Sequence, residues 1–338
     1  MTDVPANIVA LDKTCALDTT CLLEVRDLSK TYVTATGARV RALDQVSFRL
    51  APGEVLGIVG ESGCGKSTLG RCLLRLIEPT QGSIVFEGED LMRLDARTMK
   101  RHRRSLQIVF QDPFGSLNPR HRVATILREP LDVHRIGDGP SRQRRVLELL
   151  DLVGLPASAA RLYPHEFSGG QRQRVAIARA LALAPKLIVA DEPVAALDVS
   201  IQSQIINLIA ELRARLGLSL IFISHDLSVI RHVSDRIAVM YLGRICEIGT
   251  AAAVLETGAH PYTRALASAA PIPGAKGRRN RIMLQGEPPD PASPPGGCPF
   301  HPRCPQAMPH CAQEQPLLLR RRTEEGTATL ACHLYQAA

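Results

Sequence analysis

The sequence lacks any apolar run that is long enough to cross a membrane. Its longest apolar stretches, such as "LSLIFIS" and "KLIVADE", are far shorter than the roughly 20 residues of a transmembrane helix. The opening residues "MTDVPANIVALDKTC" also lack the basic segment and compact apolar core of a secretory signal. No internal repeat is present. These absences argue against a membrane-spanning or secreted protein, and we expect the chain to work in the cytoplasm.

The composition is that of an ordinary globular protein with a basic excess. Of the 338 residues, 45% are hydrophobic and 22% are charged, with 41 basic against 33 acidic residues. A net charge of +8 favours polyanions, either nucleic acid or an anionic membrane surface, without choosing between them. The basic runs at 100–105 and 319–323 are either solvated faces or docking surfaces for lipid headgroups or a partner. The nine cysteines are not expected to form disulfides in a reducing compartment, so each is a buried small residue, a metal ligand or a reactive thiol.

Hydrophobic periodicity predicts an α/β fold with a mainly parallel core sheet. Alternating residues at 22–32 and 42–50 predict an antiparallel β subdomain, and helical spacing at about 115–185 predicts an inserted helical subdomain. The strand and helix alternation then resumes to about residue 260. From Pro271 to Pro309 prolines recur every few residues, so regular structure should be sparse. We expect an N-terminal extension (1–21), a main domain (22–260) and a C-terminal region (261–338) that ends in a cysteine-containing appendage.

The segment "GESGCGKST" predicts a phosphate-binding loop, the Walker A motif. It follows the apolar run "EVLGIVG" and precedes a helix expected over Lys66–Ile77, as the motif requires. The glycines let backbone N–H groups face the phosphates, Lys66 reaches the β and γ phosphates, and the Ser67 hydroxyl ligates Mg²⁺. The residues expected to contact the nucleotide are Gly60, Ser62, Gly63, Cys64, Gly65, Lys66, Ser67 and Thr68. A helix N-terminus and Lys66 should favour the thiolate of Cys64, although this loop position can equally be inert.

An apolar strand that ends in carboxylates supplies the other half of such a site. In "LIVADE", Asp191 is placed to hold Mg²⁺ through its waters, and Glu192 to polarise the attacking water. Adjacent acids at a strand end also occur in simple solvated turns. Together with the phosphate-binding loop they predict ATP hydrolysis with Mg²⁺.

The segment "FSGGQRQR" at 167–174, followed by "LIVADE", resembles the signature of ABC-transporter ATPase subunits. Further elements of that family follow in order over about 22–260. The resemblance implies an adenine-stacking aromatic in "SKTY", Tyr32; a Q-loop glutamine that ligates Mg²⁺ in "VFQDP", Gln111; a D-loop in "AALD", Asp198; and a switch histidine in "FISHD", His225. It further implies that Ser168, Gly169, Gly170 and Gln171 contact the nucleotide of a second subunit, so that two ATPase domains close head to tail around two ATP molecules.

The segments "FQDPFGSLNPR" and "HPYTRAL" narrow the resemblance to oligopeptide and dipeptide importer ATPases, with "GSLNPR" typical of the F-type subunit. The resemblance implies a D-type ATPase partner, two membrane permeases and an extracytoplasmic binding protein, at the inner face of the cell membrane. Ala195 departs from the serine common in the D-loop. The cargo stays open, because a nickel chelate, glutathione or an antimicrobial peptide would suit the same ATPase. A soluble ABC protein acting on nucleic acid or ribosomes is a weaker alternative, since no second ATPase domain or long coiled coil is present.

Four cysteines gather in the appendage, at "GGCPFHPRCPQAMPHC" and beyond. Cys298, Cys304, Cys311 and Cys332 are separated by five, six and twenty residues, without the CxxC pairs typical of zinc sites. Because "CPFHPRC" resembles the C-terminal extension of peptide-importer ATPases that carry a four-iron, four-sulfur cluster, we favour such a cluster over zinc or unliganded thiols. The appendage follows the ATPase motifs, so its residues should not be needed for phosphate chemistry.

Overall fold

The computed structural model describes residues 8–10, 21–35, 37–269, 282–323 and 326–336. Most of the expected N-terminal extension, and residues 270–281 at the start of the proline-containing stretch, therefore lie outside the described residues. The chain divides into two compact units. The first contains the described parts of 1–50, 56–90 and 225–338, and the second contains 51–55 and 91–224.

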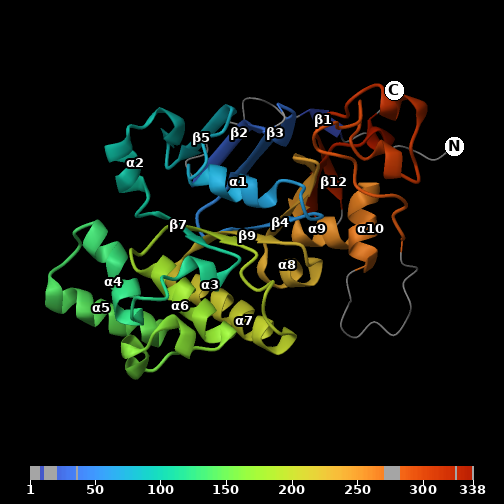
Figure 1. Ribbon diagram of the computed structural model, residues 1–338. Coiled ribbons are helices and arrows are strands. Elements are labelled where there is room, and N and C mark those ends of the chain that lie inside the picture. Colours follow the sequence, from blue (N-terminus) through green and yellow to red (C-terminus); the bar gives the residue numbers. More distant parts are fainter. Residues whose placement is uncertain (1–7, 11–20, 36, 270–281, 324–325, 337–338) are drawn as a thin grey trace. The chain divides into compact units, whose positions relative to one another are not determined.

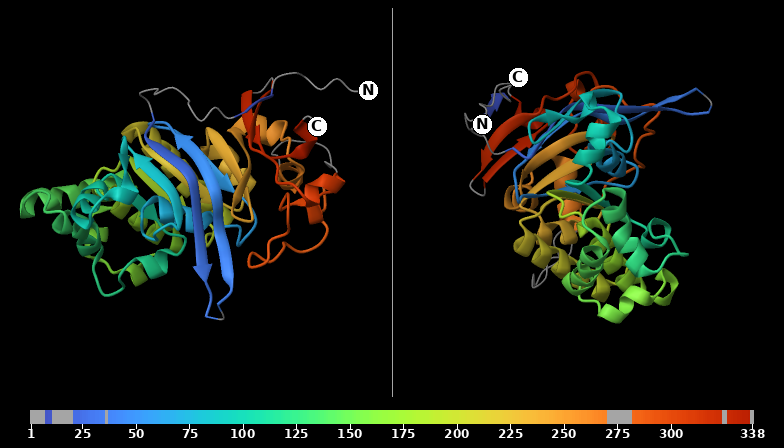
Figure 2. Two further views of the ribbon diagram at one scale, coloured as in Figure 1. Left: turned by 90° about the horizontal axis from the view of Figure 1, so that it is seen from above. Right: turned by 90° about the vertical axis from the view of Figure 1, so that its left-hand side faces the viewer.

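The first unit contains an antiparallel sheet with the strand order β3-β2-β5-β6 (Figure 1). Alternating buried and exposed residues build this sheet, which confirms the predicted antiparallel β subdomain. Its two long strands form a hairpin that extends as a ribbon (Figure 2). The strands are β2 (Leu23–Val33), β3 (Arg39–Leu50), β5 (Gln81–Phe86) and β6 (Glu89–Asp90).

A second sheet of the first unit has the strand order β1-β12-β13-β11-β10-β4. Strand β4 pairs in parallel with β10, and the remaining neighbours pair antiparallel. All five residues of β4 are buried, as is typical of a parallel strand that is covered on both faces. The strands are β1 (Ile8–Ala10), β4 (Val55–Val59), β10 (Arg236–Tyr241), β11 (Arg244–Thr250), β12 (Leu319–Thr323) and β13 (Gly326–Leu330).

In the described part of the proline-containing stretch, 282–309, regular structure is sparse, as predicted, and is limited to 3₁₀ turns. Two strands follow this stretch. Strands β12 and β13 form a hairpin, and β13 extends the sheet beside β11. The basic run at 319–323 is therefore the strand β12, in which Arg321 lies over the ring of Tyr335 at 4.7 Å. The pairing of β13 with β11 supplies hydrogen-bond partners that the local sequence does not indicate.

The helices of the first unit include one that is shorter than the sequence predicts. Helix α1 ends at Leu73 instead of continuing to Ile77, because Arg75 adopts a left-handed φ of 49° that ends the helical geometry. The helices are α1 (Lys66–Leu73), α8 (Leu227–Val233), α9 (Ala251–Glu256) and α10 (Pro261–Ala269), with short 3₁₀ turns at His301–Arg303, Pro309–Ala312 and His333–Tyr335.

A buried polar group fixes the start of α10. The carboxylate of Glu247 accepts hydrogen bonds from the backbone N–H groups of Ala259 (2.9 Å) and His260 (3.0 Å). The ring of His260 accepts a hydrogen bond at Nδ1 from the backbone of Tyr262 at 3.1 Å. Because the side chains of Glu247 and His260 are buried, these bonds offset the cost of removing polar atoms from water. They hold the start of the "HPYTRAL" segment against β11.

The second unit is built on the parallel strands β9-β8-β7, which confirms the parallel core of the predicted α/β fold. Strand β8, between the other two, is buried along its whole length. The strands are β7 (Leu106–Val109), β8 (Leu187–Asp191) and β9 (Ser219–Ser224). The helices are α2 (Ala96–His102), α3 (Pro113–Ser116), α4 (Val123–Val133), α5 (Gly139–Leu152), α6 (Gly169–Leu181) and α7 (Val199–Leu216), with 3₁₀ turns at Leu91–Arg93, Ala157–Arg161 and Pro164–Glu166.

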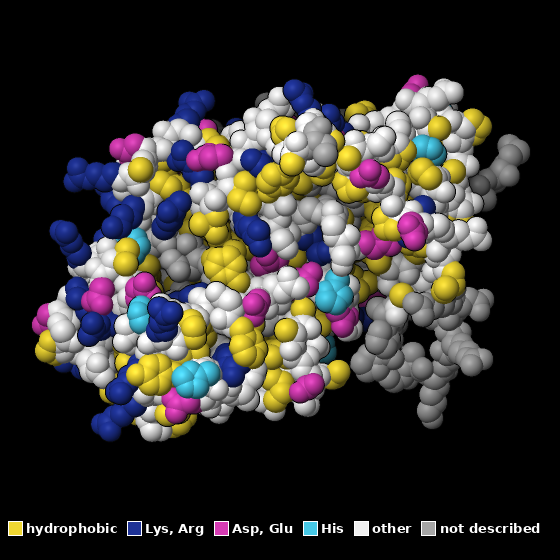
Figure 3. Space-filling model, in the orientation of Figure 1, with side chains coloured by type: hydrophobic (Ala, Val, Ile, Leu, Met, Phe, Trp, Pro, Cys, Tyr) yellow, Lys and Arg dark blue, Asp and Glu magenta, His cyan; other side chains and the backbone are white. Residues whose placement is uncertain are grey.

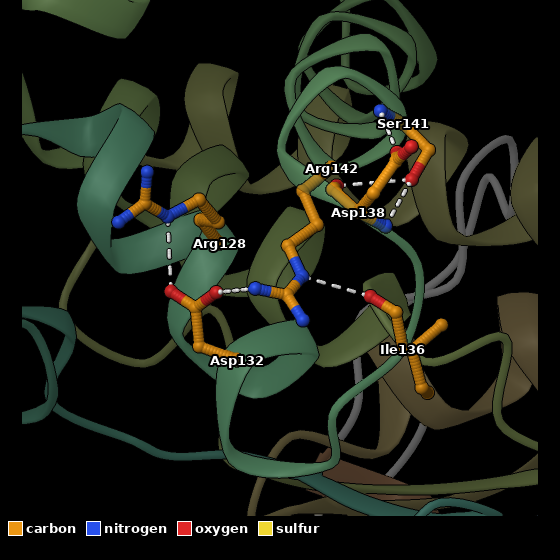
Figure 4. A network of polar contacts seen from close by, with 6 residues as sticks. All are labelled: Arg128, Asp132, Ile136, Asp138, Ser141 and Arg142. Atoms are coloured by element: carbon orange, nitrogen blue, oxygen red, sulfur yellow. Dashed lines mark hydrogen bonds and ion pairs between the residues drawn. The ribbon is translucent and has the colours of Figure 1, made fainter.

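A polar network joins α4 to α5 (Figure 4). The carboxylate of Asp132 accepts from Arg128 at 2.9 Å and from Arg142 at 2.6 Å. Arg142 also donates to the carbonyl of Ile136 in the connecting turn at 2.9 Å. Since Arg142 is the best buried of these side chains, its bonds fix the turn between the two helices. No helix among the residues described is long and apolar enough to span a bilayer.

Burial makes His260 a source of pH-dependent stability. Desolvation lowers its pKa to about 4, whereas an unfolded histidine titrates near pH 6.5. The unfolded chain therefore binds the extra proton first as the pH falls, and the free energy of unfolding should decrease by about 3 kcal/mol between pH 6.5 and 4. Denaturant unfolding at pH 7, 6, 5 and 4 measures this decrease.

The matched variant is His260→Asn, which keeps a hydrogen-bond acceptor but does not titrate. It should lose less stability than the parent over the same pH range. The comparison isolates the histidine, because both proteins contain the neighbouring Glu247. The raised pKa of Glu247 changes the stability with pH in the opposite direction. Equal pH dependence of the two proteins would show that His260 is not the source.

Candidate functional site

The phosphate-binding loop joins the end of β4 to the start of α1 in the first unit. Two of its glycines have backbone angles that side chains rarely adopt, with φ of 79° at Gly63 and 102° at Gly65. A Cβ atom on Gly65 would lie 2.2 Å from the carbonyl oxygen of Ala42, and one on Gly60 would lie 2.2 Å from that of Met240. The motif glycines are therefore required by close backbone approach as well as by backbone angle.

The motif lysine is buried against its own loop. Lys66 Nζ donates to the carbonyl oxygens of Gly60 at 2.8 Å and Glu61 at 3.0 Å. Its side chain is only 5% exposed, so these bonds compensate a charge that has little contact with water. Ser62 lies within the loop, and Ser67 and Thr68 follow Lys66 in the first turn of α1.

Glu61, the second residue of the motif, connects the loop to the C-terminal region. Its carboxylate accepts hydrogen bonds from both terminal nitrogens of Arg303, at 2.8 and 3.1 Å. Its backbone N–H donates to the hydroxyl of Tyr262 at 2.9 Å. Sequence reasoning missed both contacts. Tyr262 and Arg303 belong to the "HPYTRAL" and "CPFHPRC" segments, which the sequence analysis singled out. Neither segment indicates that its residue contacts Glu61, which lies 201 positions from Tyr262 and 242 positions from Arg303.

Cys64 does not have the thiolate character expected from its neighbours. Burial raises the pKa of the thiol, and the opposing effect of the Lys66 charge is smaller. The Cys64 sulfur lies 3.9 Å from Lys66 Nζ, and the side chain is 4% exposed. Desolvation therefore outweighs the nearby cation, and the inert alternative is favoured at this position.

In the second unit, Asp191 and Glu192 stand at the end of the buried strand β8. Asp191 is 2% exposed, whereas Glu192 turns out of the strand with a left-handed φ of 47°. Such a backbone angle is strained for a non-glycine residue. The backbone N–H of Glu192 donates to Ile223 of β9 at 3.0 Å, and Gln111 Nε2 donates to the Glu192 carboxylate at 3.0 Å. The structure thus brings together two of the predicted residues, Gln111 and Glu192.

The signature segment caps helix α6. Ser168 Oγ accepts from the backbone of Gln171 at 3.4 Å, and the Gln171 side chain accepts from the backbone of Ser168 at 3.0 Å. This reciprocal capping box orders the start of a 13-residue helix. Gly169 and Gly170 form the first turn, where a Cβ on Gly170 would lie 2.5 Å from Ile201. The N-terminal turn of α6 is therefore backbone-rich, as an anion site requires.

The remaining predicted nucleotide contacts lie at the ends or faces of strands and helices. Tyr32 is 37% exposed on β2, with the Lys30 ammonium 5.1 Å from its ring centre. Asp198 occupies the N-cap of α7. His225 is exposed and comes directly after β9 in the chain. Tyr32 thus presents ring surface to solvent, which suits stacking with a base.

The four cysteines of the appendage line one small cavity of about 10 Å³, together with His301 and His333. Burial raises the pKa of Cys332 to about 12 and also raises the pKa of Cys298 and Cys304, and the neighbouring cysteines add to these shifts. Within the described ranges, however, no three His, Cys, Asp or Glu side chains are arranged to hold a metal ion. The predicted gathering of the thiols is observed, and a ligating arrangement of them is not.

Comparison with known families gives two matches along the chain. Residues 43–195 match the family described as ABC transporter, and residues 246–311 match the family described as oligopeptide/dipeptide transporter, C-terminal region. The oligopeptide transport ATP-binding protein AppF of Bacillus subtilis is 50% identical over 323 residues, which cover 93% of this chain and 97% of AppF. The chain belongs to the ABC transporter ATP-binding proteins.

Other relatives of this ABC ATPase agree with that assignment. A putative peptide import ATP-binding protein of Brucella ovis is 53% identical over 88% of this chain and 94% of its own length. A solved dimer of the ATP-binding cassette MJ0796 bound to ADP and Pi has a TM-score of 0.61 and 32% identity, covering 68% of this chain and 98% of that one. The cbiO1 structure from Clostridium perfringens has a TM-score of 0.63 and 30% identity, covering 71% and 92%.

Family membership fixes the general activity. The chain is an ATP hydrolase, and ATP with Mg²⁺ is its cofactor system.

The buried Cys64 gives a test of the loop geometry. Because its thiol is desolvated and its pKa is raised, maleimide at pH 7.5 should modify it more slowly than the half-buried Cys304. Peptide mapping of briefly labelled protein, read by mass spectrometry, gives the relative rates, with the exposed Cys21 as an internal reference. Labelling of Cys64 ahead of Cys21 would contradict the buried geometry.

Proposed function

We propose that the ABC ATPase powers peptide import by closing head to tail, around two ATP molecules, with a second ATPase subunit. The observation that carries the peptide assignment is the near full-length similarity to AppF combined with the oligopeptide/dipeptide C-terminal region. That region contacts the phosphate-binding loop through Tyr262 and Arg303, so it is part of the ATPase and not a separate module. A nickel chelate, glutathione or an antimicrobial peptide remains an alternative cargo, because the ATPase does not contact the cargo.

In the proposed mechanism, the first unit binds the nucleotide. Tyr32 stacks on adenine, while the backbone N–H groups of the loop and Lys66 hold the phosphates. Lys66 would exchange its bonds to Gly60 and Glu61 for bonds to phosphate oxygens. His225 hydrogen-bonds the terminal phosphate and responds to its loss. The hydroxyl of Ser67 would be the ligand that this unit offers to Mg²⁺.

The second unit supplies the carboxylates and the contacts to the other subunit's nucleotide. Asp191 and Gln111 offer the hard oxygen donors that Mg²⁺ prefers, and the bound ion would neutralise charge on the phosphates. Glu192 accepts a proton from the attacking water, and its hydrogen bond from Gln111 orients the carboxylate. The capped start of α6, from Ser168 to Gln171, and Asp198 would face the nucleotide held by the partner. ATP binding then favours the closed pair, and hydrolysis permits opening.

The proposed partner is a D-type ATPase subunit in a heterodimer docked on two permeases at the cytoplasmic face of the membrane. A basic surface supports docking near anionic headgroups: Lys and Arg side chains gather over α2, α4 and α5 (Figure 3). In the run at 100–105, Lys100, Arg101 and Arg103 are exposed, whereas Arg104 bonds the carbonyl of His134 at 3.0 Å. The run therefore combines side chains that make contacts within the chain with exposed positive charge, as at Lys100. A basic surface would also attract nucleic acid, and the similarity to peptide import ATP-binding proteins is what favours docking on permeases.

Replacement of the proposed base tests the mechanism. Glu192→Gln keeps the shape of the side chain and its ability to accept from Gln111, but it removes the proton acceptor. We expect ATP binding to persist and turnover in the assembled transporter to fall at least about 100-fold. Phosphate release measures turnover.

The control for this experiment is Glu211→Gln on the exposed face of α7, which should hydrolyse ATP like the parent protein. Turnover by Glu192→Gln within about twofold of that control would remove Glu192 from the proposed role.

The cysteine cavity supports an iron–sulfur cluster as a proposal on its donor chemistry. Four thiols are the usual complement of a four-iron cluster, and these four line one cavity. Ligation would require the side chains to rearrange, since the cavity is only about 10 Å³. Bound thiolates would also lose the raised pKa that burial gives the free thiols. The cluster would act as a cross-link between Cys332, after β13, and the segment Cys298–Cys311.

Analysis of anaerobically purified protein tests this proposal. We expect a coloured protein with about four iron atoms per chain, and loss of the iron in Cys298→Ser and Cys311→Ser. The control Cys21→Ser, outside the cavity, should keep it. A colourless preparation with stoichiometric zinc, or with no metal, would contradict the cluster.

A further inference from the structure

A single arginine connects the cysteine appendage to the phosphate-binding loop. Arg303 lies at the end of the 3₁₀ turn between Cys298 and Cys304, and its side chain is only 7% exposed. Its Nη1 lies 2.8 Å from Glu61 Oε2, and its Nη2 lies 3.1 Å from Glu61 Oε1. This two-pronged geometry is the strongest form of an ion pair between arginine and a carboxylate.

We propose that Arg303 is a positioning residue for ATP binding, which cancels the charge of Glu61 and fixes that residue within the phosphate-binding loop. The appendage thereby sets the affinity of the ATPase for its nucleotide. This inference deepens the proposed function and depends on the chain binding ATP. It differs from the expectation that the residues of the appendage are not needed for phosphate chemistry, and the experiment below decides between the two.

The need for a cation at this place follows from the charge of the ligand. A loop that receives a triphosphate contains, in its second position, the carboxylate of Glu61. Two like charges at short range in a partly buried site repel more strongly than they do in water. Lys66 lies on the carbonyl side of Glu61, 3.0 Å from its oxygen, and is the residue expected to serve the phosphates. Arg303 is therefore placed to neutralise the carboxylate without removing Lys66 from the phosphates.

The backbone of Glu61 is fixed at both ends as well as at its side chain. Its N–H donates to Tyr262, and its carbonyl accepts from Lys66. Tyr262 is fully buried, with its ring 4.8 Å from that of Tyr241 and 5.3 Å from that of Phe300. A shift of Glu61 would therefore disturb a packed aromatic cluster, so the pair with Arg303 restrains the loop geometry.

Glu61 is the only charged group that contacts the guanidinium of Arg303 among the described contacts. Apart from Glu61, the guanidinium donates from Nη1 to the hydroxyl of Tyr241 at 3.3 Å. Its Nε is buried without a hydrogen-bond partner in the described part of the chain. Phe300, three residues earlier, packs edge-on against Tyr241, and its carbonyl accepts from the Arg303 backbone at 3.0 Å. Without Glu61, a nearly buried cation would keep one neutral partner, which is costly.

A comparison of three variants separates charge cancellation from simple structural support. The variants are Arg303→Met, Glu61→Gln and the double variant of both, with the exposed Arg320→Met of β12 as the matched control. MgATP and adenosine are titrated against each full-length protein at low and high potassium chloride. Thermal unfolding of each protein is recorded in parallel.

Charge cancellation predicts a specific pattern of affinities. Arg303→Met should bind MgATP about tenfold more weakly, equal to about 1.4 kcal/mol, and this loss should shrink at high salt. Adenosine, which lacks phosphates, should bind it as it binds the parent. The double variant should recover MgATP affinity to within about twofold of the parent, because the repelling carboxylate is gone. Arg320→Met should bind both ligands normally.

Other outcomes overturn the proposal. Arg303→Met that binds MgATP like the parent, or a double variant as weak as Arg303→Met at every salt concentration, would leave the pair a structural tether only. If Arg303→Met does not fold, Glu61→Gln decides, since removal of the negative charge should leave MgATP affinity equal or higher; weaker binding by this variant would contradict charge cancellation. Failure of the parent protein to bind MgATP would instead refute the proposed function.

Discussion

The ion pair between Glu61 and Arg303 joins the phosphate-binding loop to the C-terminal appendage within the first unit. Glu61 belongs to the loop after β4, and Arg303 belongs to the turn between two cysteines of the appendage. A partly buried pair of this kind contributes little when both partners are present, but the loss of either partner is costly. The phosphate-binding loop and the appendage therefore form one structural unit rather than an ATPase with an attached tail.

The fold around this contact explains how so distant a residue arrives there. Strand β13 pairs with β11, which pairs with β10 beside β4, so the sheet leads from the appendage to the strand that precedes the loop. Glu247 on β11 fixes the start of α10, and α10 carries Tyr262 to the backbone of Glu61. The C-terminal region of this ABC ATPase is thus built on the central strands.

Local sequence motifs predicted much of the fold and of the candidate site. They did not predict the contacts between residues that are far apart in the chain. The apolar run before Gly60, the alternating strands and the helical spacing each follow from a few neighbouring residues, and the structure contains the corresponding elements. The strand β12 and the buried thiol of Cys64 depend on contacts from elsewhere in the chain. The partner of Arg303 lies 242 positions away, and no periodicity encodes such a distance.

Hydrogen–deuterium exchange of the full-length protein, with and without MgATP, tests most directly whether the loop and appendage respond as one. Coupling between two sites is reciprocal. A nucleotide that orders the phosphate-binding loop should therefore also order the 3₁₀ turn that contains Arg303. The account predicts that backbone amides at 60–66 and at 300–304 both become slower to exchange when MgATP binds. Protection confined to 60–66, with unchanged exchange at 300–304, would contradict it.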